Sequence, residues 1–298
     1  MDLEALRIFV KVAELASFTR AAEQLGMAKA RASARVQALE ADLGVRLLQR
    51  TTRTVRPTAD GEQLLPRAQR LVAEAEEVAA FFQGNPTLRG VVRVDMPNNF
   101  ARDVIIPRLP ELLAVHPQLE VQLSATDRRV DVVREGFDCV LSIGTLAASG
   151  LIARRLGELT MASCASPAYL KRHGTPTTIA ELDHHLLVHY SLRLGSEPAT
   201  FEYRDGRGYA QWPMRSALTV NNADAYRAAA LAGLGIVQVP RMGVRDHLER
   251  GTLVEILADL PCEPMPVWLV HSHGRSVPKR VRAVLAWLDA VITPRLDR

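Results

Sequence analysis

Cysteine and long apolar runs are both scarce in this chain of 298 residues. There are three cysteines, Cys139, Cys164 and Cys262, and so small and uneven a number does not build a disulfide framework. Each lies beside apolar residues, so we expect buried thiols rather than redox sensors. No apolar stretch approaches a membrane span, and the N-terminus opens directly into an amphipathic helix. We therefore expect a cytoplasmic protein with no membrane contact.

Motifs for catalysis and cofactor binding are also missing. The sequence contains no G-x-S-x-G, and Gly233-Leu234-Gly235 lacks the third glycine of a dinucleotide fingerprint. Histidines cluster at positions 184, 185 and 189 and at 271 and 273, without the convergent carboxylates or cysteines of a metal site. We interpret them as surface or loop histidines. We predict no catalytic residues, no enzymatic activity, no metal site and no cofactor.

Net charge is small over most of the chain and concentrated near its start. The whole chain carries +4, whereas residues 29–56 hold seven basic and two acidic residues, a net of +5. Arginines alternate there with threonines, and guanidinium and hydroxyl groups are the usual contacts to DNA phosphates. The run V-R-L-L-Q-R-T-T-R-T-V-R-P-T-A-D-G predicts a strand, a tight wing and a return strand.

Two short helices separated by Gly26 precede the predicted wing. Ser17 can cap the first of them, Gly26 permits a left-handed turn residue, and the other helix is predicted from about Ala28 to Asp42. The residues of this last helix that should face the core are Ala32, Val36, Leu39 and Leu43. Its opposite face is small and basic, which fits a major groove. An ordinary three-helix domain with a solvated basic face is the alternative.

A winged helix-turn-helix that binds double-stranded DNA is the resulting prediction. Its expected contacts come from the start of the second helix, from the third helix and from the wing, where arginines should hold phosphates. The predicted DNA-binding residues are Ser17, Thr19, Lys29, Ala30, Arg31, Ser33, Ala34, Arg35, Arg50, Thr51, Thr52, Arg53 and Arg56.

Residues 58 to about 85 predict one long helix with a heptad seam. Thr58 can cap it, and a helix of about 25 residues extends about 37 Å. Pro66 falls inside it and predicts a bend near its start, and Gly84-Asn85-Pro86 predicts a hinge after it. Apolar residues alternate at spacings of 4 and 3, which favours pairing of two chains over packing on the helix's own domain. These residues are Leu64, Ala68, Leu71, Ala75, Val78 and Phe82.

From residue 90 onward, strands and helices alternate. We predict strands at 91–96, 119–125 and 139–143, a helix over 100–115 and a short helix over 130–135, in an order that builds a parallel sheet with covering helices. A second lobe begins near 162, and a strand at 267–271 returns to the first. Two crossings between lobes make a hinged cleft, a common place for small ligands.

Strand ends near this cleft supply the predicted effector contacts. They are Pro97, Asn98, Asn99, Ser142, Ile143, Gly144, Asn221, Asn222 and Gln238. Helix N-termini at these turns favour anions, so an organic acid or a polar aromatic molecule is the predicted ligand. The alternative is that the asparagines only cap helices.

In these features the chain resembles LysR-type transcriptional regulators. The matching residues are Phe9, Ser17-Phe18, Ala21-Ala22, Leu25, Ser33, Leu39-Glu40, Leu43-Gly44, Leu47-Leu48, Arg50, Thr58 and Gly61, and the later segments follow the family's order. The resemblance implies an α+β and α/β multidomain fold. Its parts are a winged helix-turn-helix, a long dimerising helix and a two-lobed effector domain resembling periplasmic binding proteins. The chain departs from the family at Ala28, where a hydroxyl cap is usual, and at Ala34, where an arginine is common.

We therefore expect three parts. Residues 1–59 form the DNA-binding domain, 60–89 the linker helix and hinge, and 90–298 the effector domain, with lobe I at about 90–161 plus 268–298 and lobe II at about 162–267. The expected function is a sequence-specific transcription regulator switched by a small-molecule effector. It should act as a homodimer or homotetramer, and contact RNA polymerase if it activates. The alternatives are an architectural DNA-binding protein without ligand control and a cleft enzyme with a DNA-binding tether.

Overall fold

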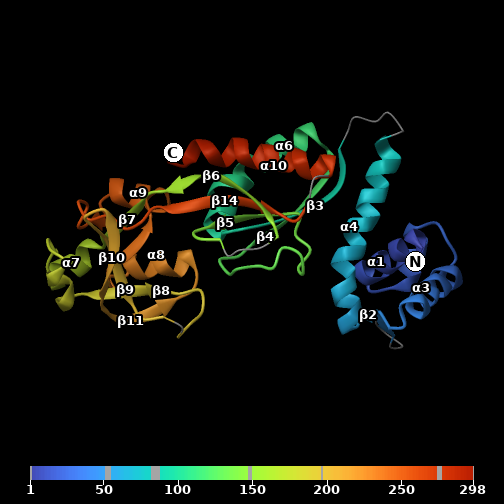
Figure 1. The fold of residues 1–298 in the computed structure, drawn as a ribbon, viewed down its shortest axis with the longest axis horizontal. Coiled ribbons are helices and arrows are strands. Elements are labelled where there is room, and N and C mark those ends of the chain that lie inside the picture. Colours follow the sequence, from blue (N-terminus) through green and yellow to red (C-terminus); the bar gives the residue numbers. More distant parts are fainter. Residues whose placement is uncertain are drawn as a thin grey trace.

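A computed structural model describes residues 2–50, 55–81, 88–146, 150–195, 197–273 and 277–297, with the backbone alone described for Arg50 and residues 76–81. A small helical domain, one long helix and two α/β lobes follow one another along the molecule (Figure 1). The predicted contacts Thr51, Thr52, Arg53 and Phe82 lie outside the described residues, as does the predicted hinge Gly84-Asn85-Pro86.

The N-terminal domain, residues 2–57, is called the winged domain below. It contains α1 (Leu3–Leu15), α2 (Phe18–Gln24), α3 (Lys29–Leu43) and an antiparallel pair of strands, β1 (Leu48–Arg50) and β2 (Val55–Pro57). The Ser17 hydroxyl caps α2 by accepting a hydrogen bond from the Arg20 N–H, whereas Ala28 gives α3 no side-chain cap, as predicted. Leu43 was predicted to face the core, but it is exposed because α3 ends there.

One long helix, α4 (Ala59–Phe81), follows the wing. Its first turn is capped by Thr58, whose hydroxyl accepts a hydrogen bond from the Gly61 N–H, and carries Asp60 and Glu62 at its positive end. One face of α4 completes the core of the winged domain through Leu64, Leu65, Ala68 and Val72. The helix therefore belongs structurally to the winged domain over at least these turns.

Lobe I is built on a five-stranded sheet of order β4-β3-β5-β14-β6. The strands are β3 (Arg89–Met96), β4 (Gln118–Ala125), β5 (Cys139–Ile143), β6 (Ile152–Leu159) and β14 (Met265–His271). Strand β3 pairs parallel with β4 and β5, whereas β14 pairs antiparallel with β5 and β6. The prediction of a parallel sheet therefore holds for two of these four strand pairings. Helices α6 (Leu109–Val115) and α10 (Lys279–Ile292) cover one face (Figure 1).

Two predicted helices of lobe I differ in the structure. The segment 100–115 is broken into α5 (Asn98–Phe100), a π-helical turn (Ala101–Ile105), a 3-10 turn (Ile106–Arg108) and α6, in a stretch where Pro107 and Pro110 lack backbone N–H groups. The segment 130–135 is a turn, because the Asp131 carboxylate accepts hydrogen bonds from two of its N–H groups and Gly136 then adopts φ +74°.

Lobe II contains the remaining strands in three small sheets. They are β7 (Met161–Ala165), β8 (Leu186–Tyr190), β9 (Thr200–Asp205), β10 (Gly208–Pro213), β11 (Arg215–Val220), β12 (Val237–Pro240) and β13 (Val254–Glu255). Its helices are α7 (Pro167–His173), α8 (Ala223–Leu231) and α9 (Arg245–Glu249), and 3-10 turns lie at Ala180–His184 and Arg241–Gly243. A further such turn, Thr293–Arg295, follows α10 in lobe I.

The cysteines and histidines complete the picture of the interior. All three cysteines are buried, which confirms buried thiols, and burial raises the pKa of each. Two histidines interpreted as surface or loop residues lie in loops but are buried: His185 beside Tyr169, and His273 beside Asp138. Within the described ranges, no helix is both long and apolar enough to cross a bilayer.

Candidate functional site

Helix α3 presents the predicted reading face of the winged domain. Ala32, Val36 and Leu39 are buried in the core, which turns the opposite side of the helix outward. Ala30 and Ala34 are exposed on that side, Lys29 is exposed at its edge, and Ser33 is half-buried. The structure therefore places these four predicted residues together on one accessible surface.

The other two predicted residues of α3, Arg31 and Arg35, lie one turn apart on its flank beside α1. Arg31 forms an ion pair of 3.1 Å with Glu4, and Arg35 pairs with Asp2 at 3.1 Å and with Glu4 at 3.3 Å. The four side chains keep between 36% and 60% of their surface exposed, so the pairs are in contact with water. Sequence reasoning missed both acids, since only the fold brings α1 to this flank.

The wing begins directly after α3 and is fixed to it by Glu40. The Glu40 carboxylate accepts hydrogen bonds from the N–H groups of Leu47 and Leu48, at 2.8 and 3.0 Å. Arg46, which precedes β1, and Arg56, the middle residue of β2, are both exposed. The predicted Arg56 is thus accessible, whereas the side chain of Arg50 is not described.

The opposite side of α4 from the winged core contacts lobe I. Pro66 faces Gly136 so closely that a Cβ atom on this glycine would stand 2.4 Å from the Pro66 Cβ. Arg70 donates a hydrogen bond to the Ser272 hydroxyl, 3.2 Å away. The buried guanidinium of Arg280 donates to the Ala73 carbonyl at 3.4 Å. These contacts, together with the contact between Gln69 and Arg93 that is described next, are called the α4–lobe I junction below.

Gln69 links three elements with one side chain. Its amide nitrogen donates to Glu14 of α1 at 3.2 Å, and its amide oxygen accepts from the Arg93 guanidinium of β3 at 3.0 Å. Arg93 is itself tied through its backbone N–H to the buried carboxylate of Asp138, 2.8 Å away, which also contacts His273. A continuous polar path therefore runs from α1 through α4 into the sheet of lobe I.

The predicted dimerisation residues of α4 have mixed environments. Ala68 is fully buried in the winged core and Leu64 packs against it, so both are used within the chain. Leu71 is 44% exposed, and Ala75 is half-buried. Of Val78 only the backbone is described. Leu71 is thus the described apolar seam residue most available to a second chain.

A cavity of about 420 Å³, open to solvent, lies between lobes I and II. Its wall combines residues that follow β3 and β4 of lobe I with residues that follow β8 and β11 of lobe II. The lining residues are Asn98, Ala125, Thr126, Asp127, Arg128, Leu192, Asn221 and Asn222. Three of these were predicted from the sequence. The others were missed, although Asp127 and Arg128 follow β4 at the same kind of strand end that led to Asn98.

The carboxylate of Asp127 joins the two lobes across this cavity. One oxygen accepts from the Asn98 N–H of lobe I at 3.1 Å, and the other from the Ala223 N–H, where α8 of lobe II begins, at 2.6 Å. On the same rim Asp224 accepts from the Asn98 side chain at 2.5 Å and from Arg102 at 2.7 Å. The relative position of the lobes is thus set partly by hydrogen bonds at the cavity itself.

The remaining predicted effector residues lie away from the cavity wall. Pro97 and Asn99 flank Asn98, and the Asn99 side chain accepts from the Phe100 N–H. Ser142, Ile143 and Gly144 end β5 and are held against β14. The Gln238 side chain bonds to Ser163 and to the backbone of Glu202 inside lobe II. Asn222 lines the cavity and also caps α8, as the capping alternative proposed.

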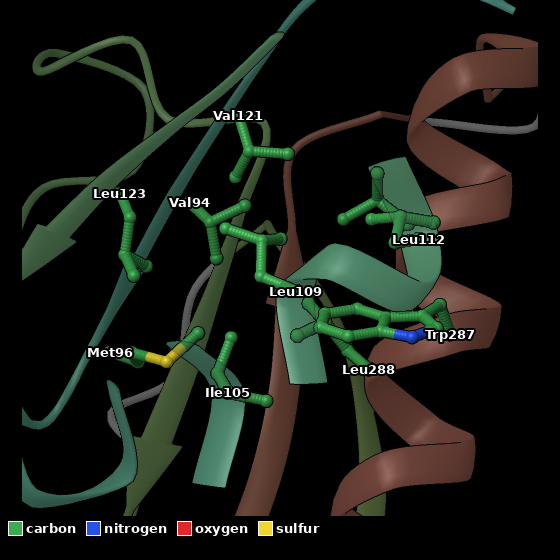
Figure 2. Close-up of a pocket in the computed structure, with 10 residues that line it drawn as sticks. Val94, Met96, Ile105, Leu109, Leu112, Val121, Leu123, Trp287 and Leu288 are labelled. Carbon is green, nitrogen blue, oxygen red and sulfur yellow. The ribbon is translucent and has the colours of Figure 1, made fainter. Parts of the chain in front are cut away.

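A second cavity, lined by apolar side chains, lies in the core of lobe I between the sheet and α10. Its volume is about 10 Å³, the space of one water molecule, and it is surrounded by residues such as Met96, Ile105 and Trp287 (Figure 2). With no polar partner pointing into it, this void is a packing defect rather than a ligand site. Among the described residues, no three His, Cys, Asp or Glu side chains group as metal ligands.

Family models match nearly the whole chain. Residues 3–62 match the bacterial regulatory helix-turn-helix protein, lysR family, and residues 85–292 match the LysR substrate binding domain. The chain is 42% identical over 296 residues to YhjC of Escherichia coli K12, named an uncharacterized HTH-type transcriptional regulator, with 99% of both chains covered. It is 32% identical to the HTH-type transcriptional activator AaeR of the same organism, over 95% of this chain and 91% of AaeR.

Solved structures give the same result for the fold. CrgA of Neisseria meningitidis, a LysR-type transcriptional regulator, aligns with a TM-score of 0.61 and 31% identity, covering 97% of this chain and 98% of CrgA. AphB, a virulence activator of Vibrio cholerae and a member of the LTTR family, aligns with a TM-score of 0.59 and 26% identity over 97% of this chain and 99% of AphB. ArgP of Mycobacterium tuberculosis shares the fold at a TM-score of 0.69 and 20% identity, covering 100% of this chain and 99% of ArgP.

Proposed function

The chain belongs to the LysR family of transcriptional regulators, and on that premise we propose how its parts act in a DNA-binding regulator controlled by an effector. Residues 1–59 bind DNA, residues 60–89 join two chains, and residues 90–298 bind the effector. One observation carries this proposal: α4 contacts both the winged domain and lobe I, the lobe that forms one wall of a cavity of about 420 Å³. A cavity of this size accommodates a small organic molecule.

In the proposed DNA complex, α3 enters the major groove. Lys29, Ala30, Ser33 and Ala34 lie on its exposed side, where side chains near a helix N-terminus meet base edges. The N-terminus of α2, with Ser17 and Thr19, and the wing, with Arg56 and the segment 50–53, hold the phosphates on either side. Arg31 and Arg35 stand at the edge of this surface, in reach of a groove wall.

The proposed effector site is the cavity between the lobes. Asn98, Asn221 and Asn222 offer amides, and Thr126 offers a hydroxyl, so the site suits a polar molecule such as an organic acid. Because Asp127 bridges the two lobes at this point, an effector that changes its hydrogen bonds also changes the angle between the lobes. Differential binding to two lobe arrangements is the physical basis of the proposed control.

The α4–lobe I junction is the proposed route from the effector to DNA. Lobe I meets α4 through Gly136, Arg93, Ser272 and Arg280, all on or beside strands of its sheet or on α10. The winged domain is joined to α4 by an apolar core. A movement of lobe I that changes these contacts would therefore alter the position of α4 and the winged domain, which move as one unit.

Two chains are needed to present two reading helices to two half-sites. We propose that the exposed part of α4, including Leu71, pairs with the same helix of a second chain, giving a homodimer or a homotetramer. An activator of this kind would also contact RNA polymerase. We further propose that the chain has no enzymatic activity and works in the cytoplasm, where it meets the chromosome.

A footprint on the DNA that flanks this protein's own gene, with and without extract of the cells it comes from, tests the proposal. We expect two protected half-sites whose spacing or hypersensitivity changes with extract. The variant Asp127→Ala should keep the protection and change its response to extract. An absence of protection at low salt would contradict DNA binding at this site, and a footprint indifferent to extract would contradict effector control.

A further inference from the structure

Two arginines of α3 that sit beside the reading face are paired with two acids of α1. Glu4 is 3.1 Å from Arg31 and 3.3 Å from Arg35, and Asp2 is 3.1 Å from Arg35. The pairs connect residues 27 and 33 positions apart, so they are a product of the fold and not of local sequence. They place two carboxylates next to two guanidinium groups at the edge of the proposed DNA surface.

Asp2 has two separate roles in this cluster. One carboxylate oxygen caps α1 by accepting a hydrogen bond from the Glu4 N–H at 3.1 Å, and the other accepts from Arg35. An asparagine at this position would still cap the helix, because its amide oxygen accepts the same hydrogen bond. The ion pair can therefore be removed without removing the cap.

The four side chains are exposed enough for their pairing to be exchanged. Each keeps more than a third of its surface in water, and exposed ion pairs contribute little to folding stability. A DNA phosphate offers the same guanidinium groups a competing partner, with counterion release as an additional driving force. The acids and the phosphates thus compete for Arg31 and Arg35.

We infer that Asp2 and Glu4 set the DNA specificity of this regulator by holding Arg31 and Arg35 against α1. On arbitrary DNA, the acids keep the two arginines from gripping the phosphates and add repulsion of their own. On a matched site, α3 enters the major groove deeply enough for the DNA phosphates to replace the two acids as partners of Arg31 and Arg35. The inference rests on the DNA-binding function proposed above and assigns a role to two residues that do not themselves touch DNA.

The test compares wild type with the double variant Asp2→Asn/Glu4→Gln on two labelled duplexes. One is a random-sequence duplex, and the other is selected by the wild-type protein from a random pool. For the random duplex we expect binding roughly three- to tenfold tighter at low salt, with a log–log salt dependence steeper by about 1.8, since each phosphate neutralised contributes about 0.9. For the selected duplex we expect a smaller gain, so the ratio of the two affinities falls.

Charge removal alone is controlled by the variant Glu23→Gln/Glu62→Gln, which neutralises two exposed carboxylates on α2 and α4. This control should not steepen the salt dependence. Adding Arg31→Gln/Arg35→Gln to the Asp2→Asn/Glu4→Gln variant should abolish its gain on the random duplex. Thermal unfolding shows whether each variant is folded, and only folded variants are compared.

Three outcomes would overturn the inference. The first is unchanged affinity and salt dependence of Asp2→Asn/Glu4→Gln on the random duplex. The second is an equal gain in the control variant, which would reduce the effect to net charge. The third is weaker binding of both duplexes, which would mean that the ion pairs stabilise α3 in the orientation that binds DNA. Failure of the wild type to bind any duplex would instead contradict the proposed function, and is distinguishable from all three.

Discussion

The two sides of α4 are held in different ways. Toward the winged domain, Leu64, Leu65, Ala68 and Val72 join an apolar core in which Ala68 is fully buried. Toward lobe I, the same turns make polar contacts through Gln69, Arg70 and the carbonyl of Ala73, and Pro66 closely approaches Gly136. Apolar burial is worth roughly 1.5–3 kcal/mol per large side chain, whereas a typical hydrogen bond contributes about 1 kcal/mol net.

The difference shows where this regulator can change shape. A close-packed core cannot slide without losing its packing, but the hydrogen bonds of the part-buried junction can be exchanged for hydrogen bonds to water when it opens, at small net cost. Helix α4 should therefore move with the winged domain, and the junction with lobe I should be the part that opens. The experiments below change the contacts of α4 with the winged domain and with lobe I, in decreasing order of expected effect.

The largest effect is expected on the apolar side. Ala68→Glu would bury a carboxylate among Leu64, Val72 and the α1 side chains, and an uncompensated buried charge costs about 3–5 kcal/mol. We expect urea unfolding to show a loss of this size in the winged domain, together with loss of DNA binding. Gln63→Glu places the same carboxylate at an exposed position of the same helix and should change stability by less than about 0.5 kcal/mol. A similar loss in both variants would contradict the comparison.

A smaller effect is expected from crowding the junction. Gly136→Ala puts a Cβ atom 2.4 Å from the Pro66 Cβ, so α4 or the turn must shift, at a cost of about 1–3 kcal/mol. Gly195→Ala is the matched control, because Gly195 has a similar φ of +78° with no atom within 4 Å of its added Cβ. Hydrogen exchange should accelerate at the lobe I side of the junction in the first variant only. Equal exchange in the two variants would mean that the contact at Pro66 is not maintained in solution.

A hydrogen bond of the junction should give a smaller value still. A double-mutant cycle with Gln69→Ala and Arg93→Ala isolates their contact of 3.0 Å, and we expect a coupling of about 0.5–1.5 kcal/mol by urea unfolding. Gln69 also bonds to Glu14, so Gln69→Ala with Glu14→Ala measures the other half of the path. If Gln69 showed no coupling free energy with Arg93 but normal coupling with Glu14, lobe I would not be energetically linked to α4 through Gln69.

The smallest effect concerns pH. Burial, and then the neighbouring His273, lower the pKa of His271, which lies at the end of β14 next to Ser272. The unfolded chain, with an imidazole pKa near 6.5, therefore binds the proton more readily than the folded chain. The free energy of unfolding should fall as the pH drops through this value, by less than about 1 kcal/mol for one partly buried group. His271→Phe should flatten that part of the pH profile, and an unaltered profile would contradict the assignment.

The sequence carried enough information for the elements that have a strong local signal. The apolar stripe of α3, the caps at Ser17 and Thr58 and the long helix α4 all follow from spacing and hydrogen-bonding chemistry within a few residues. The strand at 267–271 was predicted, but the antiparallel direction of β14 could not be, because it depends on how the chain returns from lobe II. The turn at 130–135 could not either, since the competition of the Asp131 side chain for backbone N–H groups outweighs a weak helical pattern.

The residues of the candidate sites also divide into those with a local sequence signal and those brought together only by the fold. Asn98, Asn221 and Asn222 were predicted because ligand residues are expected where strands end and helices begin. Asp127 was missed, and its role as a bridge between the lobes depends on the Ala223 N–H, which lies 96 positions away in sequence. The same holds for Asp2 and Glu4, which become relevant only when α1 packs along α3. Contacts made by tertiary packing leave no periodic trace in the sequence.

Distances between spin labels would test the central claim directly, which is that α4 moves with the winged domain and separates from lobe I. The three native cysteines are buried, so labels can be directed to cysteines introduced at the exposed positions Glu23, Glu74 and Glu120, in chains diluted with unlabelled protein. On binding of a selected duplex, we predict an unchanged distance between Glu23 on α2 and Glu74 on α4, and a changed distance between Glu74 and Glu120 on β4. A change in the first distance, or no change in the second, would contradict the account.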